Sequence, residues 1–138
     1  ISEVLAELSP RAPRHPIPLA VAYHDACHLQ HAQQVSAEPR QVLSTIPGLE
    51  VREIPESGLC CGSAGIYNLV EPEAASQLGA RKAKNVQSTG AAAIVSSNPG
   101  CLLQLQSSMR ENREGSAPIP PMYHLVEMVD ASIRGTGL

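Results

Sequence analysis

The sequence predicts an α/β fold in which helices cover both faces of a parallel sheet, and three observations support this prediction. The chain has 138 residues, which is enough for one domain with its own core. It has no Trp or Phe and only three Tyr, so its 43% hydrophobic content is mainly aliphatic, as in parallel sheets buried on both faces. Short apolar runs also alternate with helical patterns along the chain.

The first residues predict a helix followed by a stiff connector. Apolar side chains recur at the spacing of one helical face, at Ile1, Val4, Leu5 and Leu8. Four prolines between residues 10 and 18 prevent the helix from continuing. Because the sequence opens inside this helical pattern, we expect residues 1–16 to be a helix remnant and Pro-rich linker from an absent N-terminal region. Residues 17–138 should then form the domain itself.

The next stretch predicts a strand, a short helix and a second strand. Residues 19–23 form a continuous apolar run that is typical of a buried strand. Glu38-Pro39 can open a helix that Pro47-Gly48 closes. The side chains expected to face the core from this helix are Val42, Leu43 and Ile46. Residues 49–54 predict a second, weaker strand.

The second half of the chain repeats the pattern. Glu71-Pro72 begins a long helix that ends at Gly90, with one apolar stripe made of Ala75, Leu78, Gly79, Ala83 and Val86. Its basic residues are assigned to a solvated face: Arg81, Lys82 and Lys84. Residues 91–97 predict a third strand, and Asn98-Pro99-Gly100 turns the chain into another helix with Leu102, Leu105 and Met109.

The last part of the chain predicts a loop, a short strand and a final helix. Gly and Pro are frequent over residues 115–121, as in loops. Residues 122–123 can form a strand stub. The final helix should bury Leu125, Met128, Val129 and Ile133.

Each of the four cysteines follows a predicted strand: Cys27, Cys60, Cys61 and Cys101. Alternating strands and helices favour a three-layer, Rossmann-like parallel sheet, in which the carboxyl ends of the strands meet at one edge. We therefore expect the four thiols to lie together at this edge. His124 follows the possible fourth strand and should reach the same edge.

Three kinds of chemistry could explain such a cluster. A disulfide framework needs an oxidising compartment, and the sequence shows no apolar leader that would direct export, so we expect a cytoplasmic protein. A zinc ion is usually held by C-x₂₋₄-C pairs, which adjacent cysteines imitate poorly. An iron–sulfur cluster is larger, so Cys60 and Cys61 could bind different irons. The adjacent pair favours a cluster, and zinc is the alternative.

The remaining polar residues near the cysteines have simpler expected roles. Histidines are expected at the surface or hydrogen-bonded behind the metal ligands, which concerns His24, His28, His31 and His124. Asp25 is expected to cap a loop or helix. Gly62 and Gly65 are expected to serve backbone geometry. No residue is assigned a catalytic role.

Charge and hydropathy exclude two classes of partner. The formal net charge is −3, and the basic residues form no stripe that could neutralise phosphates, so we expect no nucleic-acid binding. No run of about 18 apolar residues could span a bilayer.

Four segments together resemble the cysteine-rich CCG domain: "YHDACHLQHAQ", "LCCGSAGIYNLVEP", "SSNPGCLLQLQS" and "MYHLVEMV". The resemblance covers residues 17–134 and is greatest to the C-terminal domain of glycolate oxidase iron–sulfur subunits. The family is also found in heterodisulfide reductases and in lactate-utilisation and glycerol-3-phosphate dehydrogenase proteins. Its pattern is Cys, then Cys-Cys-Gly, then Cys-x-x-Cys. The chain matches all but the last cysteine, where it has Gln104, and Ala26 replaces a frequent proline.

The resemblance implies a function and a set of partners. Cys27, Cys60, Cys61 and Cys101 would bind an iron–sulfur cluster of the 4Fe-4S type, with His24, His28, Gly62 and His124 behind them. The whole protein would be a non-flavin subunit of a glycolate dehydrogenase, passing electrons from a flavin-binding subunit toward the quinone pool, with peripheral contact to the inner membrane. The isolated domain would be inactive. Alternatives are a zinc-binding docking domain, a lactate-utilisation subunit, or a heterodisulfide-reductase-like protein with thiol–disulfide chemistry.

Overall fold

The computed structural model of the chain describes residues 1–8, 10–63, 66–113 and 118–138. Its elements in chain order are α1 Ser2–Leu8, β1 Ala20–His24, the π-helical turn η1 His28–Ala32, α2 Ala37–Ser44, β2 Glu50–Glu53, α3 Tyr67–Val70, α4 Pro72–Ser88, β3 Ala93–Ser96, α5 Pro99–Glu111, β4 Met122–His124 and α6 Leu125–Arg134. None of the helices in the described ranges is both long and apolar enough to cross a bilayer.

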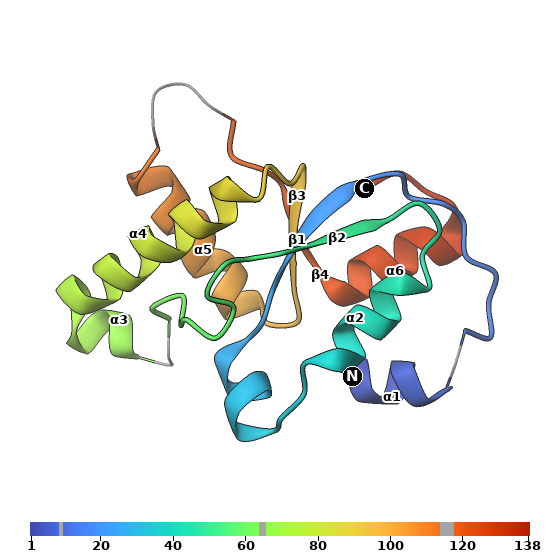
Figure 1. Ribbon diagram of the computed structural model, residues 1–138, viewed down its shortest axis with the longest axis horizontal. Helices are drawn as coiled ribbons and strands as arrows, with labels where there is room; N and C mark the ends of the chain where they lie inside the picture. Colours follow the sequence, from blue (N-terminus) through green and yellow to red (C-terminus); the bar gives the residue numbers. More distant parts are fainter. Residues whose placement is uncertain (9, 64–65, 114–117) are drawn as a thin grey trace.

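The four strands form one parallel sheet in the order β2-β1-β3-β4. Helices α2 and α6 cover one face of this sheet, with α1 beyond them against α2, while α4 and α5 cover the other face (Figure 1). The predicted three-layer α/β fold is therefore confirmed. All four strands have their carboxyl ends at the same edge.

The sheet is apolar on both faces because successive side chains of β1 point to opposite sides. Val21 and Tyr23 join the core beneath α2 and α6. Ala22, which lies between them, joins the second core beneath α4 and α5, together with Ile94 of the neighbouring strand. This burial on both faces explains why the strands appear in the sequence as continuous aliphatic runs.

The predicted elements agree with the structure to within a few residues, with three exceptions. The turn η1 and the four-residue helix α3 were not predicted, because neither carries an apolar repeat long enough to detect. Ile133 was expected to be buried but is 40% exposed, while Ala131 and Ser132 are the buried residues of the last turn of α6. Residues 115–117 of the predicted loop lie outside the described residues.

The N-terminal segment packs on the domain. Leu5 and Ala6 of α1 lie against the core beneath α2. In the connector, the backbone N–H of His15 donates to the carbonyl of Ser132 at 2.8 Å, and the Ser132 hydroxyl donates back to the carbonyl of His15 at 2.8 Å. The connector is thus held to α6. The assignment of residues 1–16 to a preceding region stays a prediction.

Candidate metal centre

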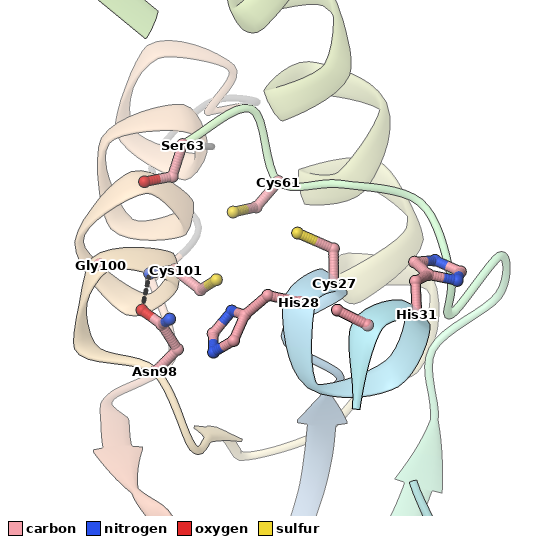
Figure 2. Close-up of a pocket in the computed structure, with 9 residues that line it drawn as sticks. Cys27, His28, His31, Cys61, Ser63, Asn98, Gly100 and Cys101 are labelled. Carbon is pink, nitrogen blue, oxygen red and sulfur yellow. Dashed lines mark hydrogen bonds between the residues drawn. The ribbon is translucent and has the colours of Figure 1, made fainter. Parts of the chain in front are cut away.

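The carboxyl edge of the sheet holds all four cysteines. Cys27 lies just after β1, Cys60 and Cys61 lie in the loop after β2, and Cys101 lies in the first turn of α5, after β3. A cavity of about 770 Å³ opens at this edge, lined by Cys27, His28, His31, Ala32, Cys61, Ser63, Asn98, Gly100 and Cys101. Figure 2 shows the sulfur atoms of Cys27, Cys61 and Cys101 pointing into one shared space. The convergence expected from strand order is therefore present.

Hydrogen bonds connect the four sulfur atoms in sequence, from Cys27 through Cys60 and Cys61 to Cys101. At the inner end, the thiol of Cys61 donates to the sulfur of Cys101, which lowers the pKa of Cys101 and raises the pKa of Cys61 to about 11. The pKa of Cys60 is raised chiefly by its hydrogen bond to Cys61, and the pKa of Cys27 is raised chiefly by burial. Cys101 is therefore the thiol that ionises most readily.

The position of Cys101 depends on the start of α5. Asn98 is the N-cap, and its side-chain oxygen accepts a hydrogen bond of 3.1 Å from the backbone N–H of Cys101. Pro99 occupies the first turn, where its missing N–H is not needed. The sulfur of Cys101 consequently lies near the positive end of the helix dipole, which also favours the thiolate.

The loop that carries Cys60 and Cys61 requires glycine at position 62. Gly62 has φ +91°, and a Cβ atom there would lie 2.5 Å from the carbonyl oxygen of Ala75 on α4. The backbone N–H of Gly62 donates to the sulfur of Cys60 at 3.3 Å, and the backbone of Ser63 bonds the sulfur of Cys61. Gly62 thus serves backbone geometry, as expected. Gly65 lies outside the described residues.

Lys82 does not lie on a solvated face, so that prediction is wrong. Its side chain is fully buried, and Nζ donates to the carbonyls of Glu56 at 3.0 Å and Ser57 at 3.1 Å. Burial lowers the pKa of Lys82. Lys82 therefore joins α4 to the start of the cysteine loop. Arg81 and Lys84 are exposed as predicted, and Arg81 pairs with Glu56.

We expect Lys82→Met to lower the free energy of unfolding by about 2 kcal/mol, because two carbonyls lose a charged donor while the aliphatic packing is largely kept. Lys84→Met is the matched control, since Lys84 is exposed on the same helix, and it should change stability by less than about 0.5 kcal/mol. Urea unfolding of both variants measures the difference. Equal stabilities would contradict the role of Lys82.

Asp25 does not act as a cap, which corrects a second expectation. Its carboxylate is 4% exposed and receives both terminal nitrogens of Arg40, each at 2.8 Å. Arg40 also bonds Glu53 of β2, at 2.7 Å and 2.6 Å, and its guanidinium lies 5.2 Å from the centre of the Tyr23 ring. These contacts raise the pKa of Arg40, chiefly through Asp25. The ion pair fixes the chain between β1 and Cys27.

The four histidines have different surroundings. His28 and His31 line the cavity, and His31 Nε2 lies 3.2 Å from the carbonyl of Gly58. His124 reaches the sheet edge but caps α6, because its Nδ1 accepts from the backbone of Val126 at 3.2 Å. His24 is 1% exposed, and neither of its ring nitrogens has a hydrogen-bond partner among the described residues. Burial lowers the pKa of His24 to about 4.

Some residues of the site were missed by sequence reasoning. The prediction named neither Ser63 nor Asn98 as lining the cavity, although Asn98-Pro99 is a recognisable N-cap signal. The burial of Lys82 also had a signal, since it continues the buried positions Ala75 and Gly79 at helical spacing. Its charge led to the opposite assignment.

The donor set fits a thiophilic metal or a metal–sulfur cluster. Thiolates and imidazole suit zinc and iron–sulfur centres, whereas magnesium and calcium need carboxylates and carbonyls. None of the described residues that line the cavity carries a carboxylate. A buried imidazole without a partner is a further indication, because it leaves a nitrogen ready to bind a metal ion.

Comparisons with known proteins agree with this chemistry. Residues 21–106 match the model of the family described as CCG, cysteine-rich domain. The "Probable glycolate oxidase iron-sulfur subunit" of Bacillus subtilis is 42% identical over 81% of this chain and 25% of its own length. A fumarate reductase (CoM/CoB) subunit of Methanothermobacter marburgensis is 36% identical over 93% and 26%, and the "Glycolate oxidase iron-sulfur subunit" of Escherichia coli is 35% identical over 83% and 26%. The chain spans about a quarter of the length of these relatives.

Proposed function

Because this chain belongs to the cysteine-rich CCG domain family, we propose that it is an electron-transfer module that holds an iron–sulfur cluster. Four thiolates would bind the cluster: Cys27, Cys60, Cys61 and Cys101. The observation that carries the proposal is that sulfur atoms from three separate loops are linked by hydrogen bonds at one edge of the sheet. Relatives with printed names that include an iron–sulfur subunit support the choice of iron over other metals.

A bound cluster supplies one-electron transfer. The residues of this chain would hold it and adjust its charge. Cys101 provides the most acidic thiol, and backbone N–H groups of Gly62 and Ser63 donate to neighbouring sulfur atoms. Hydrogen bonds to sulfur stabilise the reduced, more negative state and so raise the reduction potential.

Gln104 occupies the position of the family's last cysteine, and this favours a single four-thiolate centre. Its side-chain oxygen accepts a hydrogen bond of 3.4 Å from Asn68 of α3. The amide therefore joins α5 to α3, where a thiolate would have provided a further ligand.

In the whole protein, the module would serve a non-flavin subunit of a glycolate oxidase or a related 2-hydroxy-acid dehydrogenase. It would receive electrons from a flavin-binding subunit and pass them toward quinone, with membrane contact made peripherally through the complex. The isolated domain would have no dehydrogenase activity, because the group that oxidises the substrate would belong to the flavin subunit. The glycolate oxidase subunits of two bacteria among the relatives support this substrate class.

Anaerobic reconstitution with iron and sulfide tests the proposal. We expect roughly four irons and matching acid-labile sulfide per chain, together with an EPR signal on reduction. Ser63→Ala is a suitable control, since Ser63 lines the cavity without offering a thiol. Failure to bind iron and sulfide under these conditions would overturn the proposal.

A zinc-binding docking domain is the second candidate, and one observation favours it. Ligand atoms of His24, Cys61 and Cys101 lie within 4.8 Å of one another, close enough to share a single ion. In that case reconstitution should yield one tightly bound zinc and no sulfide, and a chelator should unfold the chain.

A further inference from the structure

His24 is the least expected residue of the centre. It is the last residue of β1, at the carboxyl edge, and only 1% of its surface is exposed. Neither Nδ1 nor Nε2 has a hydrogen-bond partner within the described residues. A buried polar group without a partner costs about 1 to 3 kcal/mol, so an ordinary core histidine at this position would be bonded to a neighbour.

The nearest charged residues are committed elsewhere. The carboxylate of Asp25 is directed to Arg40, and Nζ of Lys82 is directed to the two carbonyls of the cysteine loop. His124, which lies at the same edge of the sheet, is bonded to the backbone of α6. The His24 imidazole is thus left as a buried nitrogen donor among groups that already have partners.

The position of His24 relative to the thiols gives this free donor a role. A ring nitrogen of His24 lies within 4.8 Å of the sulfur atoms of both Cys61 and Cys101, and all three residues are buried. Ligands of one metal ion lie at such separations, since metal–sulfur and metal–nitrogen bonds are about 2.0 to 2.3 Å long. The strand fixes the backbone of His24, so the ring needs no loop movement to reach the metal.

We propose that His24 is itself a metal ligand, so that the centre has a mixed cysteine and histidine donor set. This inference rests on the proposed metal centre but goes beyond its four thiolates. A neutral imidazole in place of a thiolate leaves the centre with one negative charge fewer. Replacement of cysteine ligands by histidine raises the potential of iron–sulfur centres, so His24 would set this module above an all-cysteine centre.

The test uses the complete chain reconstituted with iron and sulfide, grown with either ¹⁴N-histidine or ¹⁵N-histidine. Pulsed EPR of the reduced centre should show a nitrogen coupling that changes with the isotope. The coupling should disappear in His24→Cys, and the midpoint potential of this variant should fall. His28→Asn is the control, since His28 lines the same cavity, and it should keep the coupling.

The isotope comparison needs no variant, so it remains decisive if His24→Cys fails to fold. A reduced centre with no histidine coupling in the unaltered chain would overturn the inference while leaving the iron–sulfur proposal intact. If no cluster forms, substitution with Co²⁺ takes its place, and loss of the nitrogen contribution to the absorption spectrum in His24→Cys is then expected. A spectrum of cobalt bound only by sulfur in the unaltered chain would also overturn it.

Discussion

Replacing Cys101 with Ser should lower the affinity of the chain for its metal centre by more than about 100-fold, the upper end of the effect of residues that only support a ligand. Cys101 is the thiol with the lowered pKa, and it is the final acceptor in the series of sulfur–sulfur hydrogen bonds. A serine hydroxyl remains protonated and binds soft metals poorly. Iron and sulfide analysis after anaerobic reconstitution, compared with Ser63→Ala, measures the loss.

The same experiment separates the metal centre from thiol–disulfide chemistry on the adjacent pair. Cys60→Ser and Cys61→Ser should also lose metal if both thiolates are ligands. In a heterodisulfide-type reaction these variants would lose turnover and keep their metal. Full iron content in Cys101→Ser or Cys61→Ser would contradict the assignment of these cysteines.

Arg40→Met should be the most destabilising surface-accessible substitution that we consider, lowering the free energy of unfolding by about 3 to 5 kcal/mol. The reason is Asp25, whose side chain is 3% exposed and which would be left as a buried carboxylate without a counter-ion. Glu53 contributes less, since its side chain is 59% exposed and water can replace the guanidinium. Urea unfolding monitored by circular dichroism measures the change.

Two further variants make this result specific. Arg134→Met removes an exposed ion pair between Arg134 and Asp130 and should cost about 0.5 kcal/mol or less. The double variant Asp25→Asn with Arg40→Met removes the buried charge and should recover part of the lost stability. If Arg40→Met and Arg134→Met were equally mild, the buried pair would have no structural role.

The strands and their common edge could be predicted from the sequence because their signals are local. Aliphatic runs such as residues 19–23 mark buried strands, and the alternation with helices implies parallel order. Cysteines placed just after these strands must then meet. That argument depends on the order of the elements and on no side-chain contact.

The errors concern charged residues whose partners lie far away in the chain. Lys82 bonds carbonyls at residues 56 and 57, and Asp25 pairs with Arg40 across the first helical crossover. A sequence pattern gives the charge of such a residue but not its partner, so exposure was the default. The expected role of His24 differs from the structure for the same reason: an imidazole was assumed to be solvated or hydrogen-bonded, and it is neither.

The support of the cysteine loop by α4 bears on the speed of electron transfer. Gly62 lies against the carbonyl of Ala75, and seven residues further along the same helix Lys82 holds the other end of the loop. A helix braced at both ends of the loop resists displacement of the sulfur atoms when one electron arrives or leaves. Little atomic rearrangement then accompanies each change of oxidation state, so the reorganisation energy of the protein is kept low before any partner docks.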